Sequence, residues 1–334
     1  MNSFERYRNR LAGKPVDRIP NFDIFMMRAA HHIGAPLSQY YQDYRVLVEA
    51  NLAMLNDFHV DIVQAISDPY REAADFGLNV EFPEDALPIN RRPLIVEPAD
   101  AANLRAPDPT TGRRMSDRLA AIRSFREQVG GEVPIMGWVE GALAEVADLH
   151  SMSLTMIDLV KRPEWIIELL ERCVEVGIAF ARAQIEAGAD IIGLGDAVCS
   201  QISPKMYRQF ALPYEQRIFA AVGELGAVGR LHICGNTTRL LPDMARGGAH
   251  IIDVDWMVDF AQAAQVFGEV AAPCGNFDPV QVMLHGTPDE VRRAVRDCAI
   301  NGGARNFSGA GCEIPDGTAA ANLLAQYQAL CELA

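Results

Sequence analysis

Short apolar runs alternate with amphipathic stretches along almost the whole chain. Each run has the length and composition of a buried strand, and the stretches between the runs have apolar residues at helical spacing. Eight strand–helix alternations with connections of the parallel type predict an α/β protein of the (β/α)8 TIM-barrel class. A doubly wound open sheet shares this alternation and is the competing topology. The eight runs span residues 18–25, 60–66, 133–139, 190–194, 230–233, 249–254, 269–273 and 305–308.

Several of the helical stretches carry clear start and stop signals. Ser203, which is followed by a proline, predicts a helix start, and Pro213 within that stretch is expected to kink or split the helix. Thr287 begins another helix, and Glu290 stands where it can complete a capping box. The Asn-Gly-Gly sequence at 301–303 is expected to end that helix.

Two segments lie outside the alternation. Residues 70–114 are rich in proline and arginine, and we expect them to form an excursion of loops and short strands. Residues 1–17 are interpreted as an N-terminal helical extension that covers one end of the barrel. With these two additions, the whole chain of residues 1–334 is predicted to form a single barrel domain.

Composition and charge narrow the range of functions. The chain has 334 residues, of which 49% are hydrophobic and 22% charged, which excludes a largely disordered protein. A net charge of −14 argues against a general nucleic-acid binder. We find neither an apolar stretch long enough for a membrane span nor a secretory signal. The seven cysteines form an odd set, so we expect reduced thiols in a cytoplasmic protein.

Side chains that can bind metals or move protons follow the ends of six of the eight runs. In a TIM barrel, chemistry takes place at the carboxyl ends of the strands, so these side chains are expected to face one site. They are Glu140, Asp196, His232, Cys234, Asp253, Asp255, Asn276 and Cys312.

His232 and Cys234 form the sharpest pair in this set. Residues two apart on a strand point to the same face, so an imidazole and a thiol can enter the barrel mouth together. Cys312, in a glycine-rich loop after the last strand, could reach in as a third ligand. Three protein ligands with one open position are the arrangement of a catalytic zinc site, and Glu140, water or substrate could take the open position.

Each of these residues also has a plainer interpretation. His232 and Cys234 could form an ordinary buried pair, and Cys312 could be a small packing residue. Glu140 could cap a helix or orient a neighbouring group, and the two aspartates after residue 252 could bind loop amides. The other five cysteines show no ligand spacing and are interpreted as packing residues: Cys173, Cys199, Cys274, Cys298 and Cys331.

Sequence blocks across nearly the whole chain resemble a known family. The opening ERYRNRLAGKPVDRIP and the later blocks LHICGNT, IIDVDW, CGNFDP and GAGCEIPDGT occur in the order expected for the uroporphyrinogen decarboxylase superfamily. The His-x-Cys-Gly block together with the late Gly-Cys-Glu-Ile-Pro block resembles the zinc-dependent corrinoid methyltransferases and O-demethylases of that superfamily. The fold of the superfamily is a (β/α)8 barrel, in agreement with the eight runs.

The resemblance implies a role for particular residues. It implies that zinc is held by His232, Cys234 and Cys312, with Glu140 as a candidate fourth ligand. It implies catalytic roles for Glu140, Asp196 and Asp255, and it implies that Asn276, Trp138 and Met27 face the substrate or the corrinoid.

The resemblance also implies a reaction. A methyl group would move between the cobalt of a corrinoid and either a thiol or a small methoxy, methylthio or methylamine compound. The chain shows no corrinoid-binding segment, so a partner protein would carry the corrinoid; a homodimer is left open. Two alternatives remain, namely a metal-free tetrapyrrole decarboxylase and a non-catalytic partner of a corrinoid protein. The first is disfavoured because Arg28 stands alone where the decarboxylases have an arginine pair.

Overall fold

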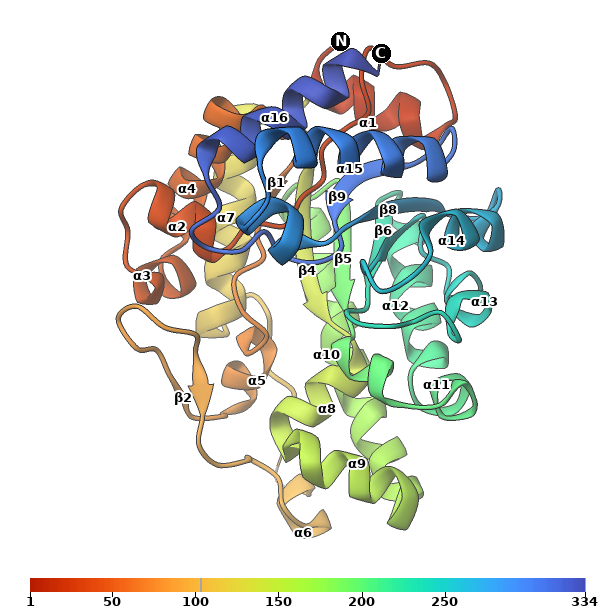
Figure 1. The fold of residues 1–334 in the computed structure, drawn as a ribbon. Helices are drawn as coiled ribbons and strands as arrows, with labels where there is room; N and C mark the ends of the chain where they lie inside the picture. The colour runs from red at the N-terminus through yellow and green to blue at the C-terminus, as the bar shows by residue number, and fades with distance from the viewer. Residues whose placement is uncertain (103, 334) are drawn as a thin grey trace.

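The computed structural model describes residues 1–102 and 104–333 and is organised around one curled parallel sheet (Figure 1). Every strand pairs in parallel with the next one along the sheet. In sheet order the strands are β1 (Val63–Gln64), β4 (Ile135–Glu140), β5 (Ile191–Gly195), β6 (Val228–His232), β7 (Ile251–Val254), β8 (Ala272–Phe277) and β9 (Phe307–Ala310).

The first apolar run closes the sheet into a barrel. Asn21 makes a parallel bridge to Ser308 of β9, and the Phe22 amide donates to the Ser308 carbonyl at 2.8 Å. On its other side, the Asn21 carbonyl accepts from the Asp61 amide at 3.0 Å. The strands follow one another around the barrel in chain order, without the reversal of a doubly wound sheet. The α/β barrel prediction is therefore confirmed.

Several strand boundaries differ from the prediction. The seventh run was expected at 269–273, but β8 begins at Ala272, because Gly268 ends the preceding helix and the next residues make a turn. The eighth run was expected at 305–308, and β9 lies two residues later. The first run forms a single bridge rather than a regular strand.

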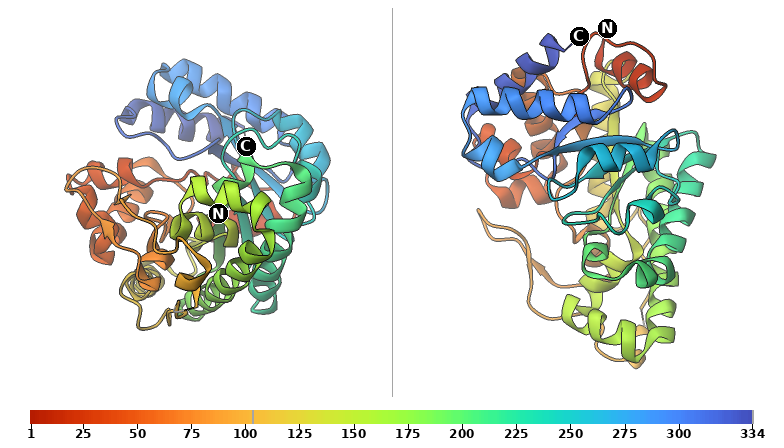
Figure 2. Two further views of the ribbon diagram at one scale, coloured as in Figure 1. Left: turned by 90° about the horizontal axis from the view of Figure 1, so that it is seen from below. Right: turned by 45° about the vertical axis from the view of Figure 1, so that its right-hand side comes forward.

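Helices surround the strands on the outside, as the end-on view shows (Figure 2). The longer ones are α4 (Tyr44–Phe58), α7 (Arg113–Val129), α10 (Pro163–Ala187), α12 (Leu212–Glu224), α15 (Pro288–Asn301) and α16 (Ala320–Glu332). Shorter ones are α2 (Met27–His32), α3 (Leu37–Gln42), α8 (Ala142–His150), α9 (Met152–Lys161), α11 (Pro204–Phe210), α13 (Leu241–Met244), α14 (Phe260–Phe267), a 3-10 helix (Ala197–Gln201) and a π-helix (Pro279–Leu284). None of the described helices is long and apolar enough to cross a membrane.

The helix signals act as predicted. Ser203 caps α11, and the helix breaks at Ala211, so that Pro213 lies in the first turn of α12, where its missing amide hydrogen is not needed. Thr287 and Glu290 form the expected capping box at the start of α15, which ends at Asn301.

The N-terminal helix α1 (Ser3–Leu11) lies at the amino ends of the strands, and Figure 1 shows both chain termini at that end. Tyr7 points into the barrel and packs on Phe22 and Phe307, with ring centroids 5.9 and 6.4 Å apart. Arg6 binds the buried carboxylate of Asp61 at 2.7 Å. This end of the barrel is therefore filled by side chains.

Residues 70–114 leave the barrel after β1 and return to it at α7. They contain α5 (Arg71–Phe76), a small antiparallel pair of β2 (Val80–Glu81) and β3 (Ile89–Asn90), and α6 (Pro98–Ala101). In Figure 1 this segment passes beside the carboxyl ends of the strands. Arg71 of α5 contributes to the cavity at that end.

Candidate metal centre

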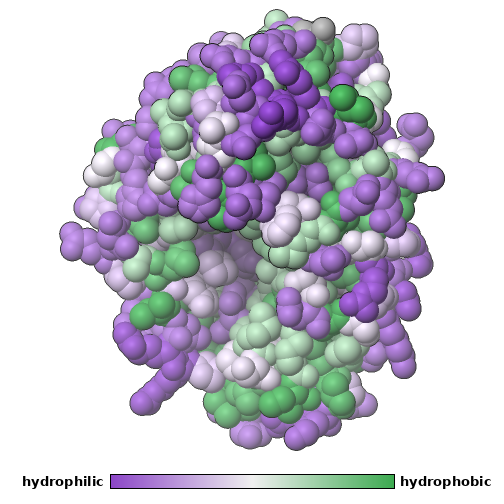
Figure 3. All heavy atoms as spheres, in the orientation of Figure 1, coloured by the Kyte–Doolittle hydropathy of each residue, from purple (hydrophilic) through white to green (hydrophobic). Residues whose placement is uncertain are grey.

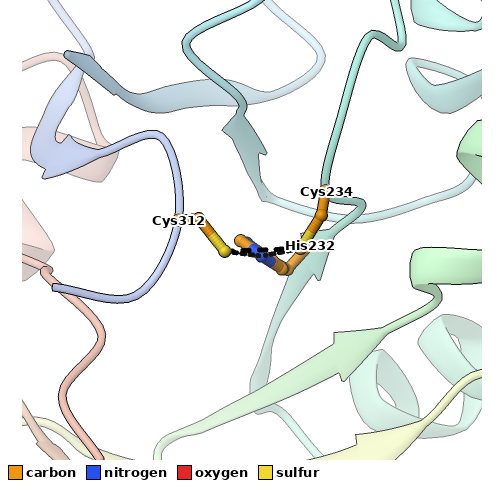
Figure 4. Close-up of side chains that lie close together, drawn as sticks. All are labelled: His232, Cys234 and Cys312. Carbon is orange, nitrogen blue, oxygen red and sulfur yellow. Dashed lines mark hydrogen bonds between the residues drawn. The ribbon is translucent and has the colours of Figure 1, made fainter. Parts of the chain in front are cut away.

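The structure brings His232, Cys234 and Cys312 together at the carboxyl end of the barrel (Figure 4). His232 is the last residue of β6, Cys234 follows two residues later, and Cys312 lies in the loop after β9. His232 Nε2 lies 3.0 Å from Cys234 Sγ and 3.8 Å from Cys312 Sγ, and the two sulfurs are 3.4 Å apart. From Zn–S of about 2.3 Å and Zn–N of about 2.0 Å, ligand atoms of a tetrahedral zinc lie roughly 3.5–3.8 Å apart. The three side chains therefore fit a zinc ion with little movement.

A buried carboxylate orients the imidazole. His232 Nδ1 lies 2.9 Å from Asp253 Oδ2, and Asp253 is held in turn by Arg230 Nε at 2.8 Å. Because a carboxylate accepts a hydrogen bond, Nδ1 carries the proton, so that in the neutral imidazole the lone pair is on Nε2, which faces the two sulfurs. Metal-binding histidines commonly have this arrangement, in which the carboxylate selects the tautomer and fixes the ring.

The thiols of Cys234 and Cys312 have their pKa values shifted in opposite directions. The hydrogen bond from Cys234 lowers the pKa of Cys312 to about 4, and His232 adds to this effect against the cost of burial. The same hydrogen bond, together with burial, raises the pKa of Cys234. The cluster therefore favours one thiolate at neutral pH, and a thiolate is the form of cysteine that binds metals.

A cavity of about 210 Å³ opens beside the cluster. Figure 3 shows the molecular surface hollowed near the centre of the face seen in Figure 1. The cavity is lined by Ile24, Met26, Ile66, Asp68, Pro69, Arg71, Trp138, Glu140, Gly195, Ala197, His232, Cys234, Cys312 and Glu313.

Five of the predicted site residues line this cavity, and five do not. Trp138 and Glu140 lie on its wall together with the three cluster residues. Asp196, Asp253, Asp255, Asn276 and Met27 are not among its lining residues. The expectation that all of them share one mouth is therefore not met in this structure.

Asp196 is turned into the protein. Its side chain is fully buried against Gly141 at the start of α8, so close that a Cβ on that glycine would lie 2.3 Å from Asp196 Oδ2. Among the described residues, neither of its carboxylate oxygens has a hydrogen-bond partner, and burial raises its pKa to about 7. Glu215 and Cys199 are its buried neighbours.

Asp255 and Asn276 organise the loops that carry the cluster. Asp255 accepts from the Gly235 amide at 2.8 Å and from the Met257 amide at 3.0 Å. Asn276 Nδ2 donates to the carbonyl oxygens of Asp255 and Val258, at 3.2 and 2.7 Å. Both side chains are thus used in holding the backbone after β6 and β7.

Met27 contributes its backbone rather than its side chain. Its amide, at the start of α2, donates to Glu313 Oε1 at 3.0 Å. The neighbouring Met26 lines the cavity instead. A one-residue difference of this kind arises because the chain turns into a helix at this point, and the sequence does not show where that turn begins.

Glu140, the candidate fourth ligand, is bound to an arginine. Its Oε1 accepts from Arg71 Nη2 at 2.6 Å, and its amide donates to Glu72 Oε1 at 3.0 Å. Burial raises the pKa of Glu140 to about 8, Glu72 adds to the shift, and Arg71 opposes it. The group of one arginine and two glutamates therefore retains a proton near neutral pH.

Sequence reasoning missed Arg71, Asp68 and Glu313 as cavity residues. Arg71 lies at the start of the 70–114 excursion and Asp68 just before it, and the path of this segment could not be derived from local pattern. Glu313 directly follows Cys312, so its position in the GCEIP block was a usable signal. Burial raises the pKa of Glu313 to about 7.

Comparison with known proteins gives relatives of two activities. A methylcobamide:CoM methyltransferase, MtaA of Methanosarcina barkeri, is 30% identical over 94% of this chain and 93% of its own length. A uroporphyrinogen decarboxylase of Syntrophotalea carbinolica is 27% identical over 86% of this chain and 85% of its own.

The solved structure of a methyltransferase from Methanosarcina mazei superposes with a TM-score of 0.91 at 26% identity, covering 100% of this chain and 99% of that one. The family model for uroporphyrinogen decarboxylase (URO-D) matches residues 2–333. The chain therefore belongs to the uroporphyrinogen decarboxylase family, as the sequence blocks predicted.

Proposed function

We propose that the protein is a zinc-dependent methyltransferase. It moves a methyl group between the cobalt of a corrinoid on a partner protein and either a thiol or a small methoxy, methylthio or methylamine compound. The observation that carries this proposal is the cluster of His232, Cys234 and Cys312, whose ligand atoms lie within 4.8 Å of one another at the wall of an open cavity. Three ligands beside a cavity leave a position for a substrate atom, as in catalytic zinc sites.

A zinc ion held by these three residues would activate a bound thiol as thiolate or polarise a methoxy oxygen or a methylthio sulfur. The chain itself supplies position and environment. Asp253 keeps His232 Nε2 facing the ligand position, and the loop contacts of Asp255 and Asn276 hold the backbone around Cys234. Trp138 packs beside the imidazole, with ring centroids 6.1 Å apart, and helps to keep water from the reacting groups.

The size of the cavity supports a separate carrier for the corrinoid. A volume of about 210 Å³ holds a small substrate but is too small to enclose a corrinoid macrocycle. The corrinoid would therefore approach the barrel mouth from outside, on the partner protein. The methylcobamide named in the M. barkeri relative agrees with this proposal.

The two alternatives have less support. A tetrapyrrole with many carboxylates needs room and cationic side chains, but Arg28 donates to the Thr318 carbonyl at 3.0 Å and does not line the cavity. A non-catalytic partner of a corrinoid protein would not need a metal-ligand cluster that opens onto a substrate-sized cavity. We therefore favour the methyltransferase.

Metal analysis of the purified protein tests the ligand set. We expect about one zinc per chain in the wild type, and less than about a tenth of that in Cys234→Ser and Cys312→Ser, because a serine hydroxyl is a poor replacement for a thiolate. Cys331→Ser, at an exposed position of α16, is the matched control and should retain zinc. Full zinc retention in both ligand variants would contradict the assignment.

Methyl transfer tests the reaction. The holoenzyme should remove the methyl group of methylcobalamin in the presence of a thiol, or methylate Co(I) cobalamin from a methyl donor. Either reaction changes the absorbance of the cobalamin. Zinc-loaded protein that performs neither reaction with any of the substrate types, while it forms a stable complex with a corrinoid protein, would favour the non-catalytic alternative.

A further inference from the structure

The indole N–H of Trp138 is a hydrogen-bond donor that the protein itself does not use. The side chain is only 3% exposed, and it lines the cavity beside the cluster. The backbone of Trp138 is fully engaged, because its amide donates to Gln184 Oε1 at 2.8 Å and its carbonyl accepts from Gln184 Nε2 at 3.0 Å. Among the described residues, no acceptor meets the indole Nε1–H. An indole N–H can only donate, and at a nearly buried position it usually has a partner. This donor is therefore available to a molecule that enters the cavity.

Two glycines of β5 set the position of the indole ring. Trp138 of β4 is in register with Gly193, and a Cβ at Gly193 would lie 2.2 Å from Trp138 Cε3. A larger side chain at Gly193 would therefore displace the ring. At Gly195, two residues further along β5, a Cβ would lie 3.0 Å from Trp138 Cζ2 and 3.2 Å from Nε1. The ring thus lies along the bare backbone of β5, with Nε1 toward the carboxyl end of the strand.

A notch lies over Gly195, between Trp138 and Glu140. Gly195 lines the cavity, and the position of its absent Cβ is 3.2 Å from Trp138 Nε1 and 3.3 Å from Glu140 Oε2. The other oxygen of Glu140 accepts from Arg71, which is the single lysine or arginine on this wall in the part of the chain that the structure describes. A substrate atom in the notch would lie within hydrogen-bonding distance of Nε1.

The notch is close to the candidate metal centre. Gly195 is in register with His232 on the neighbouring strand β6. The rings of Trp138 and His232 have their centroids 6.1 Å apart. A ligand that binds the metal through a sulfur or oxygen atom therefore needs only a short spacer to place a second polar atom in the notch.

We propose that Trp138 is a specificity-determining residue, whose indole N–H donates a hydrogen bond to an oxygen atom of the substrate in the notch over Gly195. This inference rests on the proposed methyl transfer and specifies the substrate class for the same site. The substrate is a thiol or methylated compound that carries an accepting oxygen a short spacer away from its reacting atom. The oxygen belongs to a hydroxyl group or to an anionic group such as a sulfonate, because an N–H donates to both.

The NMR signal of the indole N–H tests this contact directly. The chain has three tryptophans, so the proton–nitrogen spectrum of the zinc-loaded protein contains three indole signals, and the Trp138 signal is the one that Trp138→Phe removes. We expect 2-mercaptoethanol and 2-mercaptoethanesulfonate to move the Trp138 proton signal downfield, because a new hydrogen bond forms. In 1-propanethiol a methyl group replaces the hydroxyl, so the shift should be much smaller. An equal shift with 1-propanethiol, or no shift with either oxygen-bearing thiol, would overturn the proposal.

Titration calorimetry of zinc-loaded Trp138→Phe measures the contribution of the donor. Relative to 1-propanethiol, the variant should bind 2-mercaptoethanol about 3- to 10-fold more weakly, and the sulfonate about tenfold or more, because hydrogen bonds to ionised groups are stronger. The two oxygen-bearing probes thus distinguish a neutral from a charged acceptor. Trp165→Phe is the matched control, since the Trp165 indole is also buried without an acceptor among the described residues but does not line the cavity. Equal weakening of all three thiols in Trp138→Phe would show that the ring acts by shape alone and would overturn the proposal.

Gly195→Ala tests the place of the contact. The added methyl group fills the notch, so the Trp138 signal should remain but no longer respond to the oxygen-bearing thiols. Gly223→Ala on α12, where a Cβ has open space, is the control. A full response in folded Gly195→Ala would contradict the notch. Both measurements report binding, so methyl transfer with an unmoved Trp138 signal would contradict this inference alone, and a normal response without methyl transfer would contradict the proposed function alone.

Discussion

A single hydrogen bond orients His232 for its proposed role as a ligand. The imidazole has two nitrogens, and the 2.9 Å contact of Nδ1 with Asp253 leaves Nε2 to the cluster. Asp253 in turn is fixed by Arg230, which also donates to the Phe22 carbonyl at 2.9 Å inside the barrel. The orientation of the ligand is therefore linked to the packing of the barrel interior.

Asp253→Asn should lower the zinc affinity of the folded protein by about 10–100-fold. Arg230 would keep the amide oxygen, so the amide NH2 would face Nδ1 of His232 and favour the wrong tautomer of the imidazole. Affinity is measured by competition with a chromophoric chelator, and circular dichroism establishes that the variant is folded. Asp243→Asn is the control, since Asp243 also pairs with arginines, namely Arg208 and Arg246, but does not touch His232. Wild-type zinc affinity in folded Asp253→Asn would show that the ring is oriented by other contacts.

At the scale of the elements, α8 contains two acidic residues whose negative charges are poorly balanced by their surroundings. Glu145 is buried, and both of its carboxylate oxygens lack hydrogen-bond partners in the part of the chain that the structure describes. Burial, together with the charges of Glu72 and Asp148, raises its pKa well above 4.5. Burial also raises the pKa of Asp148. Near neutral pH, these two carboxyl groups therefore keep protons in the folded protein that they would release in the unfolded chain.

This difference gives the stability a pH dependence. Below about pH 4.5, Glu145 is protonated in both the folded and the unfolded state. As the pH rises, the unfolded chain loses this proton first. The free energy of unfolding therefore decreases until the carboxyl group of the folded protein also ionises. Each such group contributes a slope of at most about 1.4 kcal/mol per pH unit. Glu145→Gln should show a smaller decrease between pH 5 and pH 8 than the wild type, measured by urea unfolding. A wild-type slope in the variant would contradict the assignment of a retained proton to Glu145.

At the scale of the whole molecule, one end of the barrel is packed with side chains, and the candidate site lies at the other end. The amino ends of the strands are closed by Tyr7 of α1, and the cluster and the cavity lie at the carboxyl ends. Figure 1 shows the termini at the closed end. Changes at the closed end should therefore affect folding without affecting the site, as is general for barrels of this type.

Tyr7→Ala should reduce the free energy of unfolding by about 3–5 kcal/mol, because the ring leaves a cavity against Phe22 and Phe307. Chemical denaturation measures the loss. Tyr7→Phe keeps the ring and should stay within about 1 kcal/mol of the wild type. The zinc content of folded Tyr7→Ala should equal that of the wild type, and a loss of zinc at folding-permissive temperature would contradict the separation of the two ends.

Much of the architecture could be predicted from local pattern. The alternation of apolar runs and helical stretches was sufficient to predict the barrel, and the caps at Ser203 and Thr287 lie where the sequence placed them. The spacing of His232 and Cys234 predicted a shared face because side chains on a strand alternate. These features depend on residues close in the chain, so periodicity and capping chemistry are enough to recognise them.

Other features were decided by contacts between distant residues. Asp196 follows β5 as predicted, yet its side chain turns toward Gly141 of another strand–helix connection. Glu140 was expected near the metal ligands, and it is bound to Arg71, 69 residues earlier in the chain. The end of a strand determines where the backbone of a residue lies. The direction of its side chain depends on which charged and apolar groups surround it after folding.

The sequence by itself determined the fold class, the helix boundaries at several caps and the pair of candidate ligands two residues apart. Only the tertiary structure decided that Cys312 lies 3.4 Å from Cys234 and that the one arginine on the cavity wall is paired internally. The reason is physical. Backbone periodicity depends on neighbouring residues. Burial, charge compensation and ligand distances arise when distant segments pack together, 80 residues apart for His232 and Cys312 and 286 for Met27 and Glu313.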